Sequence, residues 1–321
     1  MKKFERVPLR TFKHRKLHYD ICELYPNIEK IKRELEQLKI ANSIDFTKRV
    51  LEKNPKIGTT ENSKKAYEFI LNNSEINKDS IRKLFYILSD GILDKIEENA
   101  MGKYYRKSTE YIMKKNDLTT LKEIGAKPEE IDYYMDRLIE YINEDTKGDE
   151  IDSFIKSQII HLYFVYIHPY PNINGRTSRT LSLWHLIKHV NHPFIVCDRL
   201  ISITNERYSK SIKSIYKQGN ITEYLKYILK EIEKEFERLL IIQNIMKTHK
   251  LSDNEIETIE SLLTIPNPTI ESLIRFQNIN NNYSSLETIL DEQLKQLLDE
   301  KIIILEDDRL EINRKYSKKR K

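Results

Sequence analysis

The chain has 321 residues, 33% of them charged and 39% hydrophobic, which allows two or three domains with a sizeable core and a well-solvated surface. No apolar run is long enough to cross a bilayer, and the basic first residues lack the apolar segment of a signal peptide, so we expect a cytoplasmic protein without a membrane partner. Two distant cysteines argue against a disulfide framework, and a net charge of +5 gives little support for nucleic-acid binding.

Apolar residues repeat at helical spacing along much of the chain, and seven glycines leave little material for tight hairpins. The clearest periodic stretches cover residues 21–40, 131–142 and 221–245. We therefore predict a mainly α-helical protein, with an N-terminal helical region over residues 1–95. Residues 102–113 (GKYYRKSTEYIM) depart from this pattern, because β-forming residues and Thr follow a glycine, and they predict a short β-hairpin.

The next element, residues 151–168, becomes apolar on nearly all sides and predicts a buried helix. Pro169 disfavours helical geometry at His168, so we expect this histidine at or just past the end of the helix. Asn174 is a favourable N-cap for a second helix that continues through GRTSRTLSLWHLIKHV. The stretch HPYPNINGRTSR therefore predicts a turn between two helices.

This turn places a histidine beside a helix N-terminus. Gly175 would let an anion approach free backbone N–H groups, and Arg176 and Arg179, three residues apart, can hold further phosphate oxygens. Both cations oppose the helix dipole, which indicates that an anion is expected there. His168, with an ordinary pKa of about 6.5, could act as a general base. The residues predict a phosphate site with a base, and the alternative is a plain turn with a capping Asn and surface arginines.

The motif HPYPNINGRTSR resembles the signature of the Fic (filamentation induced by cAMP) family, HPFx(D/E)GNGRxxR. The likeness implies a helical Fic core over residues 96–234 that transfers AMP from ATP, with Mg²⁺ or Mn²⁺, to a Tyr, Ser or Thr hydroxyl of a target protein or of the chain itself. His168 matches the catalytic base. The matching nucleotide-phosphate-binding residues are Asn174, Gly175, Arg176 and Arg179. The hairpin segment resembles the family's target-docking flap, in which the matching residues are Ser108, Thr109, Glu110 and Tyr111.

Two motif positions depart from the family pattern. Family members usually carry an acidic Mg²⁺ ligand where this chain has Asn172, whose neutral carbonyl oxygen is a poorer ligand for a hard cation. Ile173 stands where Gly is usual, and would either crowd the phosphate loop or turn its side chain into the core. These departures leave open a slow enzyme, an altered donor or an inactive relative.

A possible inhibitory helix is expected near residues 58–72. Glu61-Asn62 matches part of the family's inhibitory pattern (S/T)xxxE(G/N), with Ile57 at the Ser/Thr position. By the resemblance, Glu61 would pair with Arg179 while no γ-phosphate is bound, and in some relatives this glutamate also supports removal of AMP. A plain exposed glutamate at a helix start is the alternative.

The C-terminal part differs from the core. After a helical connector over residues 235–250, residues 251–313 predict three short helices and two strands joined by an Asp-Asp turn, which is the outline of a winged-helix domain. The third helix, residues 284–300, is acidic and would bind DNA phosphates poorly, so a protein-interaction or dimerisation module is favoured over a DNA reader. Residues 314–321 form a basic tail.

The sequence is therefore compatible with two functions. The first is an autoinhibited protein adenylyltransferase. The second is a degenerate Fic core that senses a nucleotide and regulates through DNA or protein contacts of the C-terminal domain. Asn172 and the C-terminal domain keep the second alternative open.

Overall fold

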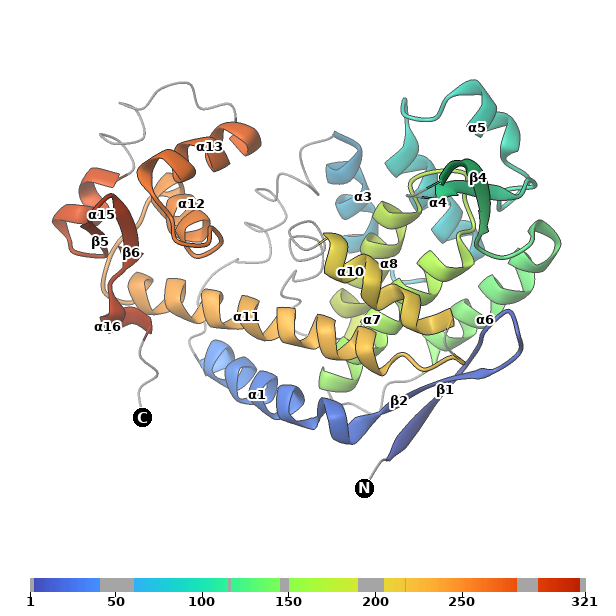
Figure 1. The fold of residues 1–321 in the computed structure, drawn as a ribbon, viewed down its shortest axis with the longest axis horizontal. Coiled ribbons are helices and arrows are strands. Elements are labelled where there is room, and N and C mark those ends of the chain that lie inside the picture. The colour runs from blue at the N-terminus through green and yellow to red at the C-terminus, as the bar shows by residue number, and fades with distance from the viewer. Residues whose placement is uncertain are drawn as a thin grey trace. The chain divides into compact units, whose positions relative to one another are not determined.

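The computed structural model describes residues 3–40, 61–114, 117–144, 150–189, 205–216, 218–281 and 294–317. The chain divides into two compact units (Figure 1). Unit 1 combines Met1–Lys32 with Ile44–Ile232, and unit 2 combines Arg33–Ser43 with Glu233–Lys321. The described residues are mainly α-helical with small antiparallel strand pairs, which confirms the predicted fold class.

Unit 1 is built around two helices, α7 (Glu150–Ile167) and α8 (Asn174–His189), which pack along each other. Leu162, Tyr163 and Phe164 of α7 are all 0% exposed, which confirms that this helix is buried on several sides. The other helical elements that contribute to unit 1 are α1 (Ile21–Ile40), α3 (Glu61–Leu71), α4 (Lys78–Ser89), α5 (Lys95–Ala100), η1 (Pro128–Glu130), α6 (Ile131–Asn143), α10 (Asn205–Ile212), η2 (Lys213–Tyr216) and α11 (Thr222–Met246).

The first residues form a β-hairpin, so the predicted N-terminal helical region over residues 1–95 was wrong for this segment. Strands β1 (Phe4–Arg10) and β2 (Lys16–Asp20) pair antiparallel. Val7 and Leu9 are buried while their neighbours are not, which is the alternation of a half-buried strand. Among the described residues, β1 pairs with β2 alone, and Pro8 is compatible with this strand because proline is tolerated in edge strands.

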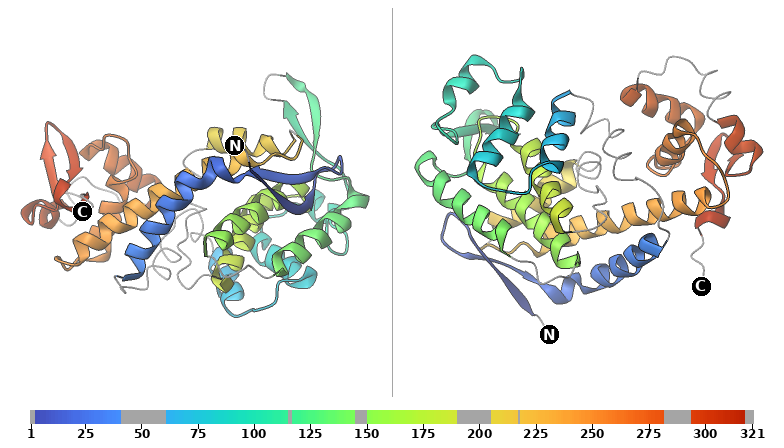
Figure 2. Two further views of the ribbon diagram at one scale, coloured as in Figure 1. Left: turned by 90° about the horizontal axis from the view of Figure 1, so that it is seen from below. Right: turned by 180° about the vertical axis from the view of Figure 1, so that it is seen from behind.

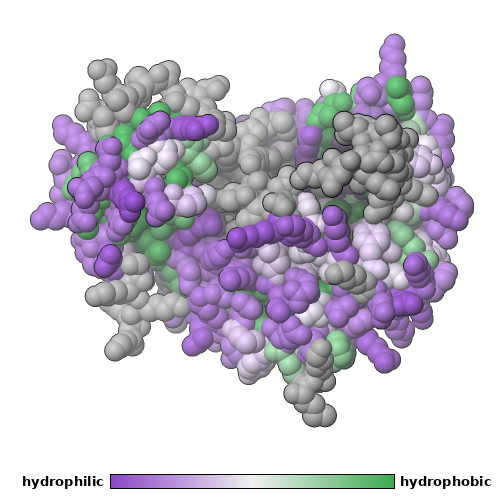
Figure 3. Space-filling model, in the orientation of Figure 1, coloured by the Kyte–Doolittle hydropathy of each residue, from purple (hydrophilic) through white to green (hydrophobic). Residues whose placement is uncertain are grey.

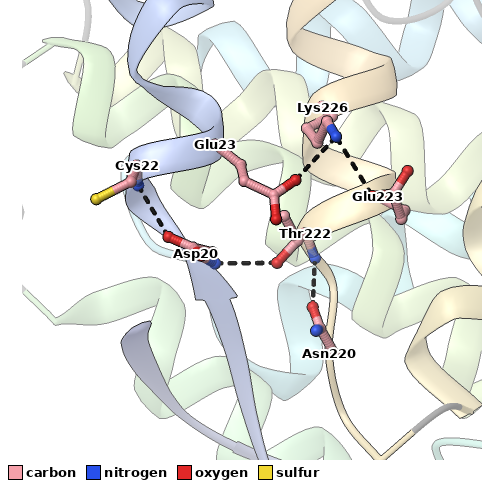
Figure 4. A network of polar contacts seen from close by, with 7 residues as sticks. All are labelled: Asp20, Cys22, Glu23, Asn220, Thr222, Glu223 and Lys226. Atoms are coloured by element: carbon pink, nitrogen blue, oxygen red, sulfur yellow. Dashed lines mark hydrogen bonds and ion pairs between the residues drawn. The ribbon is translucent and has the colours of Figure 1, made fainter. Parts of the chain in front are cut away.

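A polar network joins the end of this hairpin to the start of α11 (Figure 4). The N–H of Asp20 donates to Thr222 Oγ1 at 2.9 Å, and Asp20 Oδ1 accepts the N–H of Cys22 at 3.1 Å. Next to them, Lys226 Nζ lies 2.9 Å from a carboxylate oxygen of Glu23. These contacts connect segments about two hundred residues apart in the sequence and hold both ends of unit 1 together.

A second hairpin extends from the helices of unit 1 (Figure 2, left panel, green). Strand β3 (Glu110–Lys114) pairs antiparallel with β4 (Asp117–Ile124), and Glu110 is opposite Ile124. A hairpin near this place was predicted, but the sequence placed it within residues 102–113. The structure begins the first strand later and supplies the second strand from residues that were not predicted to be extended.

Unit 2 contains the rest of α11 and the C-terminal elements. The helix α11 continues without a break to Met246, through most of the residues 235–250 predicted as a connector. Asp307 and Asp308 both have positive φ, 45° and 70°, as the two-residue turn between β5 and β6 requires. The further elements of this unit are α12 (Asp253–Leu262), α13 (Ile270–Asn281), α15 (Lys295–Asp299), β5 (Ile303–Glu306), β6 (Arg309–Ile312) and α16 (Arg314–Ser317). Much of the third predicted helix lies outside the described residues, so the winged-helix assignment stays a prediction.

Candidate functional site

The catalytic candidate His168 lies directly after α7, as predicted from Pro169. Its backbone N–H donates to Phe164 O at 3.0 Å, which is the last bond of the helical ladder. Its φ is +54°, a left-handed conformation that costs a non-glycine residue roughly 1–2 kcal/mol. Surrounding contacts must therefore hold this residue in place.

A buried arginine supplies these contacts. Arg106 is 2% exposed, and its guanidinium donates to three backbone carbonyls. Nε donates to His168 O at 2.8 Å, Nη2 donates to Ala126 O at 2.6 Å, and Nη1 donates to Ser108 O. In addition, its backbone N–H donates to Pro169 O at 2.9 Å. Arg106 thus fastens the histidine turn to both ends of the β3–β4 hairpin, a role the sequence analysis missed.

Gly125, just after β4, allows the hairpin to approach the turn this closely. Its φ is +76°, and a Cβ at this position would lie 2.6 Å from His168 Cβ and 2.7 Å from Ile167 O. The next residue, Ala126, donates its N–H to Ile167 O at 2.9 Å. Any side chain at position 125 would therefore push against the catalytic candidate.

Burial and a neighbouring charge set the protonation state of His168. Burial first, and then the Arg106 cation, lower the pKa of the imidazole to about 4. The ring is therefore neutral near pH 7, which leaves a ring nitrogen able to accept a proton.

The start of α8 follows within a few residues, and one prediction about it was wrong. Asn174 is the first helical residue and does not cap the helix with its side chain. Its Oδ1 accepts the N–H of Tyr170 at 3.0 Å, and its Nδ2 donates to Tyr170 O at 2.6 Å. Ile173 lies before the helix, and its carbonyl accepts the N–H of Thr177 at 2.9 Å. The Asn174 amide faces back into the turn and stabilises it.

Ile173 turns its side chain into the core. It is 5% exposed and has a φ of +62°. Glycine adopts this conformation without strain, whereas a β-branched residue does so at a cost. Of the two predicted outcomes for this residue, the structure supports burial rather than crowding of the phosphate loop.

The first turn of α8 has the features of an anion site. The first amide groups of a helix have no partner within it, and they carry the positive end of the helix dipole. Gly175 is the second residue of α8, and a Cβ there would lie 3.2 Å from Arg179 Nη1. Arg176 and Arg179 are both only partly buried, so this turn combines backbone donors with two cations.

A neutral histidine lies behind this turn. His161 is 0% exposed, and its ring nitrogens lie 3.1 Å from Ser178 Oγ and 2.6 Å from Tyr208 Oη. Burial, and then the Arg179 charge, lower the pKa of His161 to about 3. Both nitrogens are occupied, so His161 is a packed core group and not a second base at the surface.

Asn172 is exposed, and both ends of its side chain are engaged. Its Oδ1 accepts the N–H of Ile173 at 2.7 Å, and its Nδ2 donates to Glu97 Oε1 at 2.7 Å. Mg²⁺ prefers hard oxygen ligands, above all carboxylates, so the amide alone is a poor ligand while Glu97 adds a suitable one. The donor set of Glu97 with Asn172 therefore fits a divalent cation better than Asn172 does by itself. The sequence analysis missed Glu97.

The predicted flap residues lie at the start of β3, two just before the strand and two within it. Ser108 and Thr109 precede β3, while Glu110 and Tyr111 begin it, and Tyr111 is 54% exposed. The pKa of the Glu110 carboxyl is raised, mainly by burial. The Arg106 charge opposes this rise, and the Glu97 charge adds to it. The hairpin that holds these residues is tied to the histidine turn through Arg106.

The possible inhibitory residue Glu61 is the first residue of α3 and is exposed. Residues 57–60 lie outside the described residues. Helix α3 packs against α8, because the Phe69 and Trp184 rings are 5.5 Å apart and Trp184 Nε1 donates to Asn73 O at 2.9 Å. Between Glu61 and Arg179, both of which the structure describes, there is no ion pair, and the inhibitory role stays a prediction.

Residues 76–186 match the family model of the Fic/DOC family. The match covers about a third of the chain and includes α4, the β3–β4 hairpin and the turn between α7 and α8. Among solved structures, the chain is similar to a Fic family protein from Desulfovibrio desulfuricans G20, at 15% identity and a TM-score of 0.48 over 91% of this chain and 87% of that one.

Within the described part of the chain, no helix is both long and apolar enough to cross a bilayer. The surface visible in Figure 3 is largely hydrophilic where the residues are coloured.

Proposed function

We propose that this protein is an adenylyltransferase that moves AMP from ATP to a hydroxyl side chain of a target protein. The observation that supports it most directly is the position of a neutral His168 in the same short turn that leads into the N-terminus of α8. A base and an anion site so close together suit a reaction in which a hydroxyl attacks a bound phosphate.

The proposed chemistry uses each part of the turn. His168 takes the proton from the target hydroxyl, the hydroxyl oxygen forms a bond to the α-phosphorus, and the bond from this phosphorus to the β-bridging oxygen breaks. Pyrophosphate leaves with the electron pair. The amides at Asn174 and Gly175 and the side chain of Arg176 would hold the phosphates, and Arg179 would meet the γ-phosphate. A divalent cation, when bound, supplies further neutralisation of phosphate charge.

The β3–β4 hairpin would align the target. Its first strand pairs with β4 on one side, and an extended target segment could pair with the other edge by backbone hydrogen bonds. Arg106 would keep this strand in register with His168, because it bonds to the backbone of both segments.

Labelled ATP tests this proposal. The purified full chain is incubated with Mg²⁺ or Mn²⁺ and ATP labelled on either the α- or the γ-phosphate, alone and with a cell extract as the source of targets. AMP transfer predicts label on protein from the α-phosphate and none from the γ-phosphate. Label from the γ-phosphate would indicate phosphoryl transfer, and nucleotide binding without any label would favour the nucleotide-sensing alternative.

A further inference from the structure

A carboxylate from outside the motif contacts the motif turn. Glu97 in α5 and Asn172 are 75 positions apart in the sequence, yet Glu97 Oε1 accepts a hydrogen bond from Asn172 Nδ2 at 2.7 Å. Glu97 Oε2 accepts the N–H of Asp94 at 3.0 Å, in the capping box that begins α5. Two N–H donors therefore fix the orientation of the Glu97 carboxylate, and each of its oxygens keeps a further lone pair.

The hydrogen bonds of Asn172 suit it to orient the Glu97 carboxylate rather than to bind a cation itself. Its Oδ1 already accepts the N–H of Ile173 at 2.7 Å, so the side chain spans from the backbone of the turn to the Glu97 carboxylate. An amide in this position fixes the carboxylate by donating a hydrogen bond but adds no negative charge. In metal sites, ligating carboxylates are commonly held by such hydrogen bonds from neighbouring groups.

We propose that Glu97 is the anionic protein ligand of the divalent cation that accompanies the nucleotide, and that Asn172 is a positioning residue that orients Glu97. This inference rests on the proposed function, because it concerns the cation of the same phosphate site. Asn172 carries no negative charge. Glu97 in α5, which is hydrogen-bonded to Asn172, supplies this charge instead. A carboxylate oxygen is the type of ligand that Mg²⁺ and Mn²⁺ prefer.

Glu97→Gln isolates the charge. Glutamine keeps the length of the side chain and also serves at this position of a capping box, so α5 is expected to remain folded. Glu98→Gln is the matched control, since Glu98 is the next residue in the same turn of α5 and is exposed. Both variants remove one negative charge from α5, and only the first removes it beside Asn172.

Mn²⁺ binding to the full chain is measured from the electron paramagnetic resonance signal of free Mn²⁺, without nucleotide and with α,β-methylene-ATP, from which AMP cannot be transferred. We expect Glu97→Gln to weaken Mn²⁺ binding at least tenfold and Glu98→Gln to leave it unchanged. In the double variant Glu97→Gln/Asn172→Asp, a carboxylate returns at the motif position, so Mn²⁺ binding is expected to recover. This recovery would not follow if Glu97 only held α5 against the turn.

The outcomes separate the two proposals. Equal Mn²⁺ affinity in the wild type and in Glu97→Gln overturns the assignment of Glu97, as does a wild type that binds no Mn²⁺ under either condition. Binding of α,β-methylene-ATP is measured separately by calorimetry in the presence of Mg²⁺. If no nucleotide binds to any variant, the proposed function fails, while a loss of nucleotide-free Mn²⁺ binding confined to Glu97→Gln still supports the cation site.

Discussion

At the scale of single residues, the catalytic candidate depends on a buried arginine. Arg106 contributes to the low pKa of His168 and also holds its carbonyl oxygen at 2.8 Å. Because the folded-state pKa of about 4 lies below the ordinary value, the imidazole stays neutral as the pH falls through the usual histidine range. The Arg106–His168 pair leads to the first prediction, and Gly125, which lies against His168, leads to the second.

The first prediction concerns the protonation of His168. In a nuclear magnetic resonance titration of imidazole signals, the His168 ring is expected to stay neutral to about pH 5 and to protonate near pH 4. Arg106→Gln removes the nearby cation and should raise this pKa, whereas Lys107→Gln, an exposed neighbour of the same charge, should not. A wild-type His168 that titrates near pH 6.5 would contradict the assignment of its surroundings.

The second prediction separates contact from backbone strain at Gly125. Gly125→Ala and Gly91→Ala both place a side chain at positive φ, but only the first would meet atoms of the histidine turn, since nothing lies within 4 Å of a Cβ at Gly91. Gly91→Ala should lower the free energy of unfolding by roughly 1–2 kcal/mol. Gly125→Ala should lower it by more, and should also shift the His168 imidazole signals. Equal effects in denaturant titrations of both variants would show that the close approach at Gly125 does not matter.

At the scale of elements, helix α8 carries a buried histidine next to the chain's single tryptophan, Trp184. His185 is 0% exposed, and among the described residues neither of its ring nitrogens has a hydrogen-bond partner. Burial first, and then the His189 charge, lower its pKa to about 2. The unfolded chain therefore binds a proton below about pH 6.5 that the folded protein does not.

The third prediction follows from this difference. As the pH falls from 6.5 toward 4, the stability of unit 1 should decrease, with His185 and the equally buried His161 each contributing up to about 1.4 kcal/mol per pH unit. Trp184 fluorescence in denaturant titrations reports this unfolding. His185→Phe should reduce the slope with pH by about one histidine's share, and His14→Phe, an exposed control, should not. An unfolding midpoint that is independent of pH over this range would rule out the effect.

The sequence predicts an element well when the residues that determine it lie within a few positions of one another. The helix over residues 151–167 and the turn after it follow from apolar spacing and from Pro169, which act within a few residues. The β1–β2 hairpin and the strand β4 were missed, because their short alternating patterns become strands only through pairing with another segment. Arg106 and Glu97 were missed for a similar reason, since their partners in the motif turn lie 62 and 75 residues away.

At the scale of the whole molecule, the region that matches the Fic/DOC family model is one part of a larger chain. The family match ends at residue 186, while unit 1 continues to Ile232 and includes the N-terminal hairpin. Helix α3 precedes the matched region and packs on α8, the helix that carries Arg179. This packing provides a route by which a segment outside the matched region could regulate the proposed phosphate site.

The fourth prediction tests that regulation. If Glu61 restrains Arg179 while no γ-phosphate is bound, Glu61→Gly should increase labelling from α-labelled ATP by at least tenfold. Glu68→Gly, at an exposed position on the same helix, serves as the control for charge and for the glycine itself. If Glu61→Gly labels no faster than the wild type, Glu61 is not inhibitory, and the adenylyltransferase proposal is unaffected.

The most direct test of the central claim compares binding and transfer in a single variant, His168→Ala. If His168 is the base and the first turn of α8 holds the triphosphate, this variant should bind ATP as the wild type does while its transfer of α-labelled AMP falls at least a hundredfold, within the usual contribution of a general base. Transfer at the wild-type rate in His168→Ala would contradict the account.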